Sequence, residues 1–208
     1  TERYRFEALA EEAARRGDER VSRHMLVIEA TAAMFEAASG GDTAERFQRY
    51  VRNLRMPERN PGSVGLGCSI LAEPGDRGAL ARAYEANRGA PLEIWPDPGA
   101  SDAVVVAVLF ENVDDFDAGP QLTSGFNAFS DPTRRAAIDR ATTDRAPRAA
   151  GPVTLVSNAA PPLLSFVIYA PVYGPNFGVS HEGEDRPSGF VVAAFHAAEL
   201  IDSALRVV

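Results

Sequence analysis

The stretch Ala103-Val-Val-Val-Ala-Val-Leu-Phe110 is an uninterrupted apolar run. It is rich in β-branched valine and short for a helix, so it predicts a β-strand. Because successive side chains of a strand point to opposite faces, both faces of this strand must be buried. The run therefore predicts a sheet that is covered on both sides, with residues 103–110 as a central strand.

The residues before this strand predict helices and further strands. Apolar residues at helical spacing over residues 6–35 predict one long helix. A second helix is expected to begin at an Asp42 or Thr43 cap and to end at Pro57. The remaining segments are a strand over 64–71, a helix over 77–87 and a strand over 92–95.

The residues after the strand complete an α+β pattern. Ser130 or Asp131 is expected to cap a helix that runs to Arg145, with Pro132 in its first turn. Strands are expected over 152–156, 163–172 and 189–195, and a terminal helix over 197–208. The pattern predicts an α+β fold, with a helical stalk region over residues 1–60 and a sheet-containing body over residues 61–208.

Charge and composition exclude several classes of function. The 208 residues carry a net charge of -8, and residues 1–60 are neutral, so residues 61–208 hold the whole excess. Without a basic stripe, no nucleic-acid partner is expected. Cys68 is the only cysteine, so no intramolecular disulfide forms. No apolar run approaches the roughly 20 residues of a membrane span, and flanking transmembrane helices are expected outside this chain.

Catalytic and metal-binding motifs give little support for an enzyme. The sequence contains no nucleophile elbow and no Cys/His signature, so no catalytic residue and no cofactor are expected. The segment His181-Glu-Gly-Glu-Asp185 gathers an imidazole and three carboxylates. A metal held by His181, Glu182, Glu184 and Asp185 is an alternative to the simpler interpretation of a solvated loop.

Several blocks in the second half of the chain occur in a specific order and spacing. They are Phe126-Asn-Ala-Phe-Ser-Asp-Pro-Thr-Arg-Arg-Ala-Ala-Ile138, Arg140-Ala141, Pro147, Gly151-Pro-Val-Thr-Leu155 and Phe166-Val-Ile-Tyr-Ala-Pro-Val-Tyr173. Together with Val64-Gly-Leu-Gly and Asp76-Arg77, they resemble CHASE domains, the extracytoplasmic sensor domains of histidine kinases, diguanylate cyclases and plant cytokinin receptors. The resemblance covers essentially the whole chain.

The resemblance implies a long N-terminal stalk helix, tandem PAS-like antiparallel sheet modules and a C-terminal helix, with the ligand in the membrane-distal module. Apolar side chains with a few amides and hydroxyls suit a small-molecule pocket. Asn127 stands where family members usually have Asp, and Cys68 stands where an aromatic residue is usual. The implied ligand-binding residues are Asn127, Phe129, Thr143, Ala149, Leu155, Asn158 and Phe166.

The resemblance also implies a function for the chain. It would be the periplasmic, ligand-sensing part of a bacterial inner-membrane receptor, binding an unknown small molecule without chemistry of its own. Stalk helices would pass the signal to a cytoplasmic output module, a histidine kinase in preference to a diguanylate cyclase. A homodimer through the N-terminal helix is expected. The alternative is a degenerate sensor that binds nothing and serves as a dimeric spacer or a partner-protein docking domain.

Overall fold

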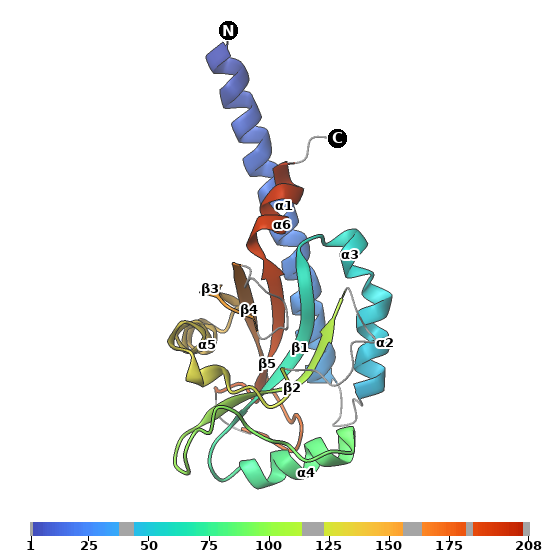
Figure 1. The fold of residues 1–208 in the computed structure, drawn as a ribbon, viewed down its shortest axis with the longest axis vertical. Helices are drawn as coiled ribbons and strands as arrows, with labels where there is room; N and C mark the ends of the chain where they lie inside the picture. The colour runs from blue at the N-terminus through green and yellow to red at the C-terminus, as the bar shows by residue number, and fades with distance from the viewer. Residues whose placement is uncertain (1, 38–43, 114–122, 156–163, 182–184, 206–208) are drawn as a thin grey trace.

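A long helix projects from a body built on a β-sheet (Figure 1). The computed structural model describes residues 2–37, 44–113, 123–155, 164–181 and 185–205. The helices, including the 3₁₀ helix η1, are α1 (Glu2–Ala37), α2 (Ala44–Leu54), α3 (Met56–Arg59), α4 (Arg77–Arg88), η1 (Ala128–Ser130), α5 (Pro132–Asp144) and α6 (Ala197–Leu205).

Five antiparallel strands form the sheet in the order β2-β1-β5-β4-β3. Strand β5 is the middle strand and leads directly into α6. The strands are β1 (Ser63–Ala72), β2 (Val104–Asn112), β3 (Arg148–Val153), β4 (Ser165–Val172) and β5 (Gly189–His196).

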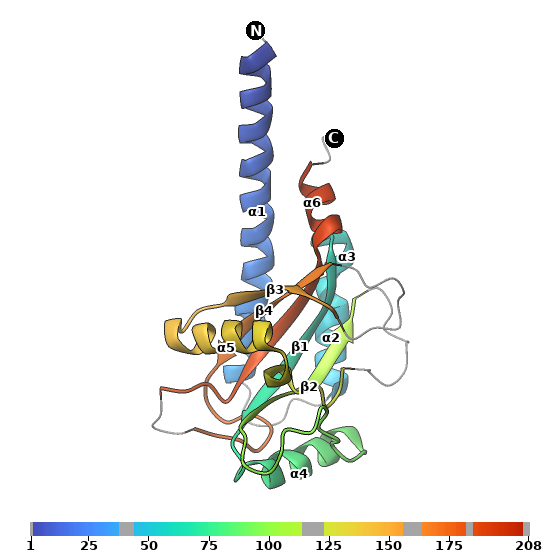
Figure 2. The same cartoon turned by 60° about the vertical axis from the view of Figure 1, so that its left-hand side comes forward.

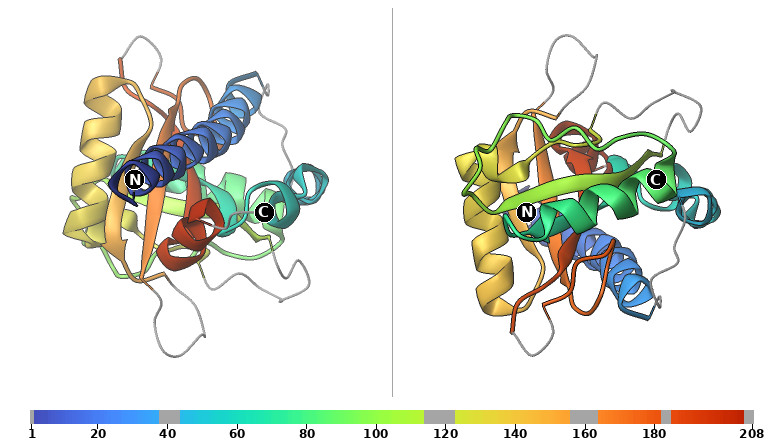
Figure 3. Two further views of the ribbon diagram at one scale, coloured as in Figure 1. Left: turned by 90° about the horizontal axis from the view of Figure 1, so that it is seen from above. Right: turned by 90° about the horizontal axis from the view of Figure 1, so that it is seen from below.

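Helices cover both faces of the sheet (Figure 2). Helices α1 and α2 pack on one face, which we call the α1 face, and α5 with η1 packs on the other, the α5 face. The view from above in Figure 3 shows α1 and α5 apart from each other, and the two helices contribute to the separate core clusters of the two faces. This arrangement confirms that both faces of the apolar strands are buried, as residues 103–110 predict.

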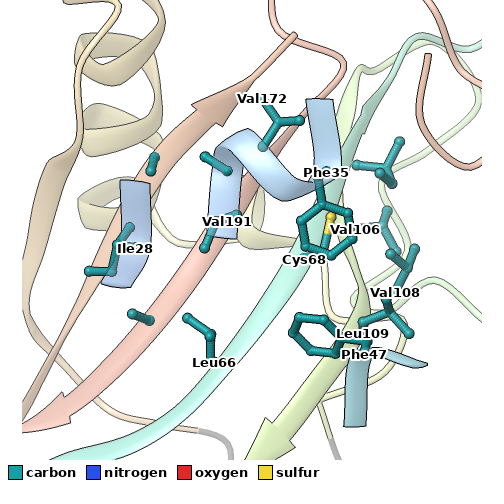
Figure 4. Packing of buried hydrophobic residues seen from close by; sticks show 14 of the residues in the cluster. Ile28, Phe35, Phe47, Leu66, Cys68, Val106, Val108, Leu109, Val172 and Val191 are labelled. Carbon is teal, nitrogen blue, oxygen red and sulfur yellow. The ribbon is translucent and has the colours of Figure 1, made fainter. Parts of the chain in front are cut away.

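The α1 face is the larger part of the core (Figure 4). Ile28 and Phe35 of α1 and Phe47 of α2 are each at most 2% exposed and belong to the same buried cluster as Leu66 and Cys68 of β1. The rings of Phe35 and Phe47 are 5.5 Å apart. The second half of the apolar stripe predicted over residues 6–35 is therefore a surface that binds the sheet.

On the α5 face, Ala137, Ile138 and Ala141 of α5 are each at most 1% exposed. Helix α5 begins as the sequence predicts. The Asp131 carboxylate accepts hydrogen bonds from the backbone N–H groups of Thr133 (2.8 Å) and Arg134 (3.2 Å). An N-cap of this kind satisfies donors that the first helical turn leaves free, and it fixes where the helix starts.

Some expectations are wrong. Strand β2 lies at the edge of the sheet and not at its centre, and residues 92–95 contribute only a single bridge from Trp95 to Phe126. At Ala107, on the outer edge of β2, the backbone N–H donates to the Phe126 carbonyl and the backbone carbonyl accepts from the Gly125 N–H. These bonds satisfy part of the edge, which explains how an apolar strand is accommodated there.

Other differences concern the module count and one side chain. Within the described ranges there is one five-stranded sheet, and no tandem modules are found. Strand β3 spans Arg148–Val153, earlier than the predicted 152–156. His24, although it follows the charged Arg23, is 4% exposed, and its ring lies 5.0 Å from that of Phe195 in an edge-on arrangement.

The N-terminal half of α1 extends beyond the sheet, and α6 lies beside α1 at the same end of the molecule (Figures 1 and 2). Both helices leave the sheet in the same direction, so they form a paired stalk. Among the described residues, no helix combines the length and the hydropathy needed to cross a membrane.

A substitution of Gly67 in β1 tests the close packing between β1 and β2. A Cβ atom at this position would lie 2.3 Å from the backbone oxygen of Leu109 and 2.7 Å from the Phe110 ring. We expect Gly67→Ala to lower the free energy of unfolding by about 2 kcal/mol, because backbone on a paired strand cannot move aside. Urea denaturation measures the change.

Gly75 provides the matched control, since a Cβ atom there would have nothing within 4 Å. Gly75→Ala should leave the urea midpoint within the error of the wild type. Equal stability of the Gly67 and Gly75 variants would contradict the packing described for β1 and β2.

Candidate functional site

The α5 face carries a group of apolar side chains that are only half-buried. They come from two strands, from the segment before α5 and from the residues after β3, and they pack against the buried core of this face. Small-molecule sites in proteins are lined mainly by apolar and aromatic side chains with a few polar groups. We call these residues the aromatic cluster: Val64, Phe110, Phe126, Phe129 and Leu155.

Two glycines of β1 make room for Phe110. A Cβ atom at Gly65 would lie 2.4 Å from Phe110 Cε1, and one at Gly67 would lie 2.7 Å from Phe110 Cδ2. The ring therefore lies directly over the β1 backbone, where side chains would otherwise stand. The glycine repeat, which lacks the further residues of a phosphate-binding loop, has a packing role that brings an aromatic ring onto this face.

Phe126 is positioned by a tight turn. Gly125 adopts a φ of +79°, and a Cβ atom there would lie 1.8 Å from the backbone oxygen of Glu93. This close approach places the Phe126 ring 5.0 Å from that of Trp95, whose indole N–H donates to the Ser124 carbonyl at 3.0 Å. The turn thus fixes Phe126 between the Trp95 segment and the start of α5.

Asn127 is buried and ties the segment before α5 to the sheet. Its Oδ1 atom accepts hydrogen bonds from the backbone N–H groups of Val105 (3.3 Å) and Phe129 (3.1 Å). The first bond reaches β2, and the second caps η1. The side-chain oxygen of Asn127 is thus occupied by hydrogen bonds within the protein, so the main role of Asn127 is to hold the segment before α5 in place.

Arg134 is a buried cation on the α5 face, with 5% of its surface exposed. Its Nη1 donates to the Tyr169 hydroxyl at 3.3 Å, and its Nη2 donates to the Thr154 carbonyl at 3.0 Å. Its Nε lies 3.5 Å from a carboxylate oxygen of Asp131, and its guanidinium carbon lies 5.2 Å from the centre of the Phe126 ring. The guanidinium links α5, β4 and the end of β3 beside the aromatic cluster.

Burial also affects the hydroxyl that Arg134 contacts. Desolvation raises the pKa of Tyr169 above its ordinary value, and the positive charge of Arg134 opposes this rise. Tyr169 therefore stays a neutral phenol at physiological pH. It can accept the hydrogen bond from Arg134 but cannot neutralise its charge.

Three of the residues implied by the family resemblance lie on the α5 face: Asn127, Phe129 and Leu155. Phe129 is half-buried, and the guanidinium of Arg135 lies 4.6 Å from the centre of its ring. Leu155 packs against the same core from the end of β3. The structure brings these three together near the start of α5.

The other implied residues lie elsewhere. Thr143 is exposed near the end of α5, where its hydroxyl donates to the Asp139 carbonyl at 2.9 Å. Ala149 is exposed on β3, because its neighbour Ala150 faces the core. Phe166 lies on the α1 face and stacks on Phe195, with ring centres 5.0 Å apart. Asn158 falls outside the described residues.

Phe110, Phe126 and Arg134 belong to the site but were not among the implied residues. The sequence contains a signal for Arg134, because it stands at helical spacing with Ala137, Ile138 and Ala141. A charged residue in an apolar stripe is unusual and marks a polar site inside a core. Phe110 could be found only by knowing that it pairs with Gly67.

The metal alternative finds no support in the described ranges, where no group of three or more candidate ligands occurs. His181 lies near the Leu71 carbonyl, with 3.3 Å between Nε2 and the oxygen, and Asp185 pairs with Arg145 at 2.5 Å. Glu182 and Glu184 fall outside the described residues. Desolvation raises the pKa of the buried Cys68 thiol to about 12, so it is not a reactive thiolate at neutral pH.

Comparison with protein-family models matches residues 42–207 to the CHASE domain. The match covers most of the chain, so the chain belongs to the CHASE domain family. CHASE domains are non-catalytic, extracytoplasmic sensing domains of signalling receptors. A comparison with curated proteins finds no match.

The role of Asn127 can be tested by substitution. Asn127→Leu leaves the N–H groups of Val105 and Phe129 without an acceptor, so we expect it to lower the free energy of unfolding by about 2 kcal/mol. Asn127→Asp retains both acceptor positions and should stay within about 1 kcal/mol of the wild type. Urea denaturation at pH 7 separates the two, and a leucine variant as stable as the wild type would refute the capping role.

Proposed function

We propose that this chain is a ligand-binding sensor region of a transmembrane receptor and that it binds a small molecule at the aromatic cluster. The observation that carries the proposal is the combination of half-buried aromatic rings with the buried guanidinium of Arg134 on one face of a CHASE domain. Apolar contacts would supply affinity, and the few polar groups would orient the ligand.

The path of the signal is also part of the proposal. Strand β5 contributes Val192 and Ala194 to the α5 face, and Phe195 to the α1 face, where Phe195 contacts His24 of α1. It then continues into α6. A ligand that favours one position of β5 would therefore bias the relative position of α1 and α6. These two helices would carry the bias towards flanking transmembrane helices.

The remaining parts of the proposal rest on the resemblance. The chain would face the periplasm of a bacterial cell, and the output module would be a histidine kinase in preference to a diguanylate cyclase. The sequence that flanks this chain in its parent protein would reveal both the transmembrane helices and the output module.

A thermal-shift screen of small molecules tests ligand binding. A molecule present at 100 times its Kd stabilises the folded state by about 2.7 kcal/mol. For a chain of this size we expect Tm to rise by roughly 5–10 °C. Phe129→Ala should abolish the shift, because it removes a ring of the aromatic cluster.

Thr143→Ile is the control, since Thr143 is exposed near the end of α5, away from the aromatic cluster. It should leave the shift unchanged. A screen without any shift would favour the alternative function, a spacer or partner-protein docking domain that binds no ligand. Equal loss in both variants would place the ligand elsewhere.

A homodimer through α1 belongs to the proposal as well. Ile28 and Phe35 are buried against the sheet, so the apolar stripe of this half of α1 cannot also bind a second chain. Leu26 and Val21, which are 66% and 50% exposed, remain on the outer side of the helix. The dimer contact would therefore use these residues and the projecting part of α1.

Sedimentation velocity over a range of concentrations tests the dimer. Leu26→Glu should weaken self-association at least tenfold, because it places a charge in an apolar contact. Ala86→Glu, at an exposed position of α4, adds the same charge elsewhere and should have no effect. A wild-type chain that remains monomeric at the highest concentration would contradict this part of the proposal.

A further inference from the structure

Within the described part of the chain, the positive charge of Arg134 is only partly compensated by neighbouring groups. A guanidinium has five N–H donors, and hydrogen bonds to described residues use two of them, to Tyr169 and Thr154. Both acceptors are neutral. Nε has no hydrogen bond within the described ranges, although it lies 3.5 Å from Asp131.

Asp131 is a weak counter-ion for Arg134. Its side chain is 33% exposed, and its other carboxylate oxygen is engaged by the backbone N–H groups at the start of α5. A buried charge is costly unless a close, well-oriented partner offsets the loss of water. Among the described residues, Arg134 is therefore a buried cation whose two hydrogen-bond acceptors are neutral and whose one nearby carboxylate is partly exposed.

A second guanidinium, that of Arg135, contacts another ring of the aromatic cluster. Arg135 lies over the Phe129 ring at 4.6 Å, as Arg134 lies near the Phe126 ring at 5.2 Å. Two positive charges thus contact two rings of the cluster, although the body of the chain has an excess of eight acidic residues. This local positive charge runs against the overall charge, so it does not follow from composition.

From these contacts we infer that the ligand of the aromatic cluster is a small organic acid, with a carboxylate bound by Arg134 and a flat apolar part against Phe126 and Phe129. This inference rests on the proposed function and specifies its ligand. A planar carboxylate matches the paired donors of a guanidinium, and it would supply the missing negative charge. A flat apolar group would cover the half-buried rings.

The experiment compares acids with amides of the same skeleton, using the purified chain and isothermal titration. The probes are benzoate with benzamide, phenylacetate with phenylacetamide, and indole-3-acetate with indole-3-acetamide, and adenine serves as a neutral flat molecule. We expect at least one acid to bind at least tenfold more tightly than its amide. Arg134→Gln should weaken acid binding until it equals amide binding, and amide binding itself should change less than acid binding.

Arg134→Gln could fail to fold, because Arg134 links α5 to Tyr169 and Thr154. The pair Arg135→Gln and Arg140→Gln avoids this difficulty, since both residues are exposed on α5. Arg135 contacts Phe129, whereas Arg140 donates to the Ala136 carbonyl at 3.2 Å. Arg135→Gln should weaken acid binding at least threefold, and Arg140→Gln should leave it unchanged.

The possible results separate this inference from the proposed function. If adenine or the amides bind as tightly as the acids and Phe129→Ala abolishes that binding, the sensor function stands and the organic-acid inference is overturned. Equal effects of Arg135→Gln and Arg140→Gln would also overturn it. If no probe binds, the organic-acid inference is overturned, and the thermal-shift screen alone decides whether the ligand-binding function stands.

Discussion

The alternation of side chains along β1 is the constraint on which both layers of the molecule depend. Leu66, Cys68 and Ile70 point to the α1 face and are fully buried there, whereas Gly65 and Gly67 leave the α5 face of the strand bare. One face can therefore be filled to native density by α1 and α2. On the other face, the ring of Phe110 covers the two glycines, and Phe110 is one of the half-buried residues of the aromatic cluster.

Strand β5 connects these two layers. Its odd and even residues face opposite sides, so Phe195 packs between Phe166 and His24 while Val192 and Ala194 face α5. Packed side chains do not deform continuously, because close packing allows only discrete arrangements. A shift of β5 on the α5 face would therefore be felt at His24, where the stalk meets the sheet.

The sequence predicts most individual helices and strands well, but it predicts less well which of them lie side by side in the fold. Apolar periodicity predicts α1, and cap and proline signals predict α2 and α5, with the Asp131 cap confirmed, because these features depend on residues close in the chain. The edge position of β2 depends on pairing with distant segments, which periodicity does not contain. The misplacement of Phe166 has the same origin, because a neighbouring strand position such as Val167 faces the opposite side of the sheet.

Asn127 is a neutral amide just before α5, and Arg134 is a buried cation in the first turns of that helix, which has an electrostatic consequence. A carboxylate at position 127 could accept the same hydrogen bonds from Val105 and Phe129, but it would add a negative charge beside Phe126, whose ring contacts Arg134. Asn127 performs the structural task without that charge. With Asn127, the positive charge of Arg134 is therefore less compensated than it would be with Asp at that position. The difference matters because charges in a poorly solvated site are screened only weakly.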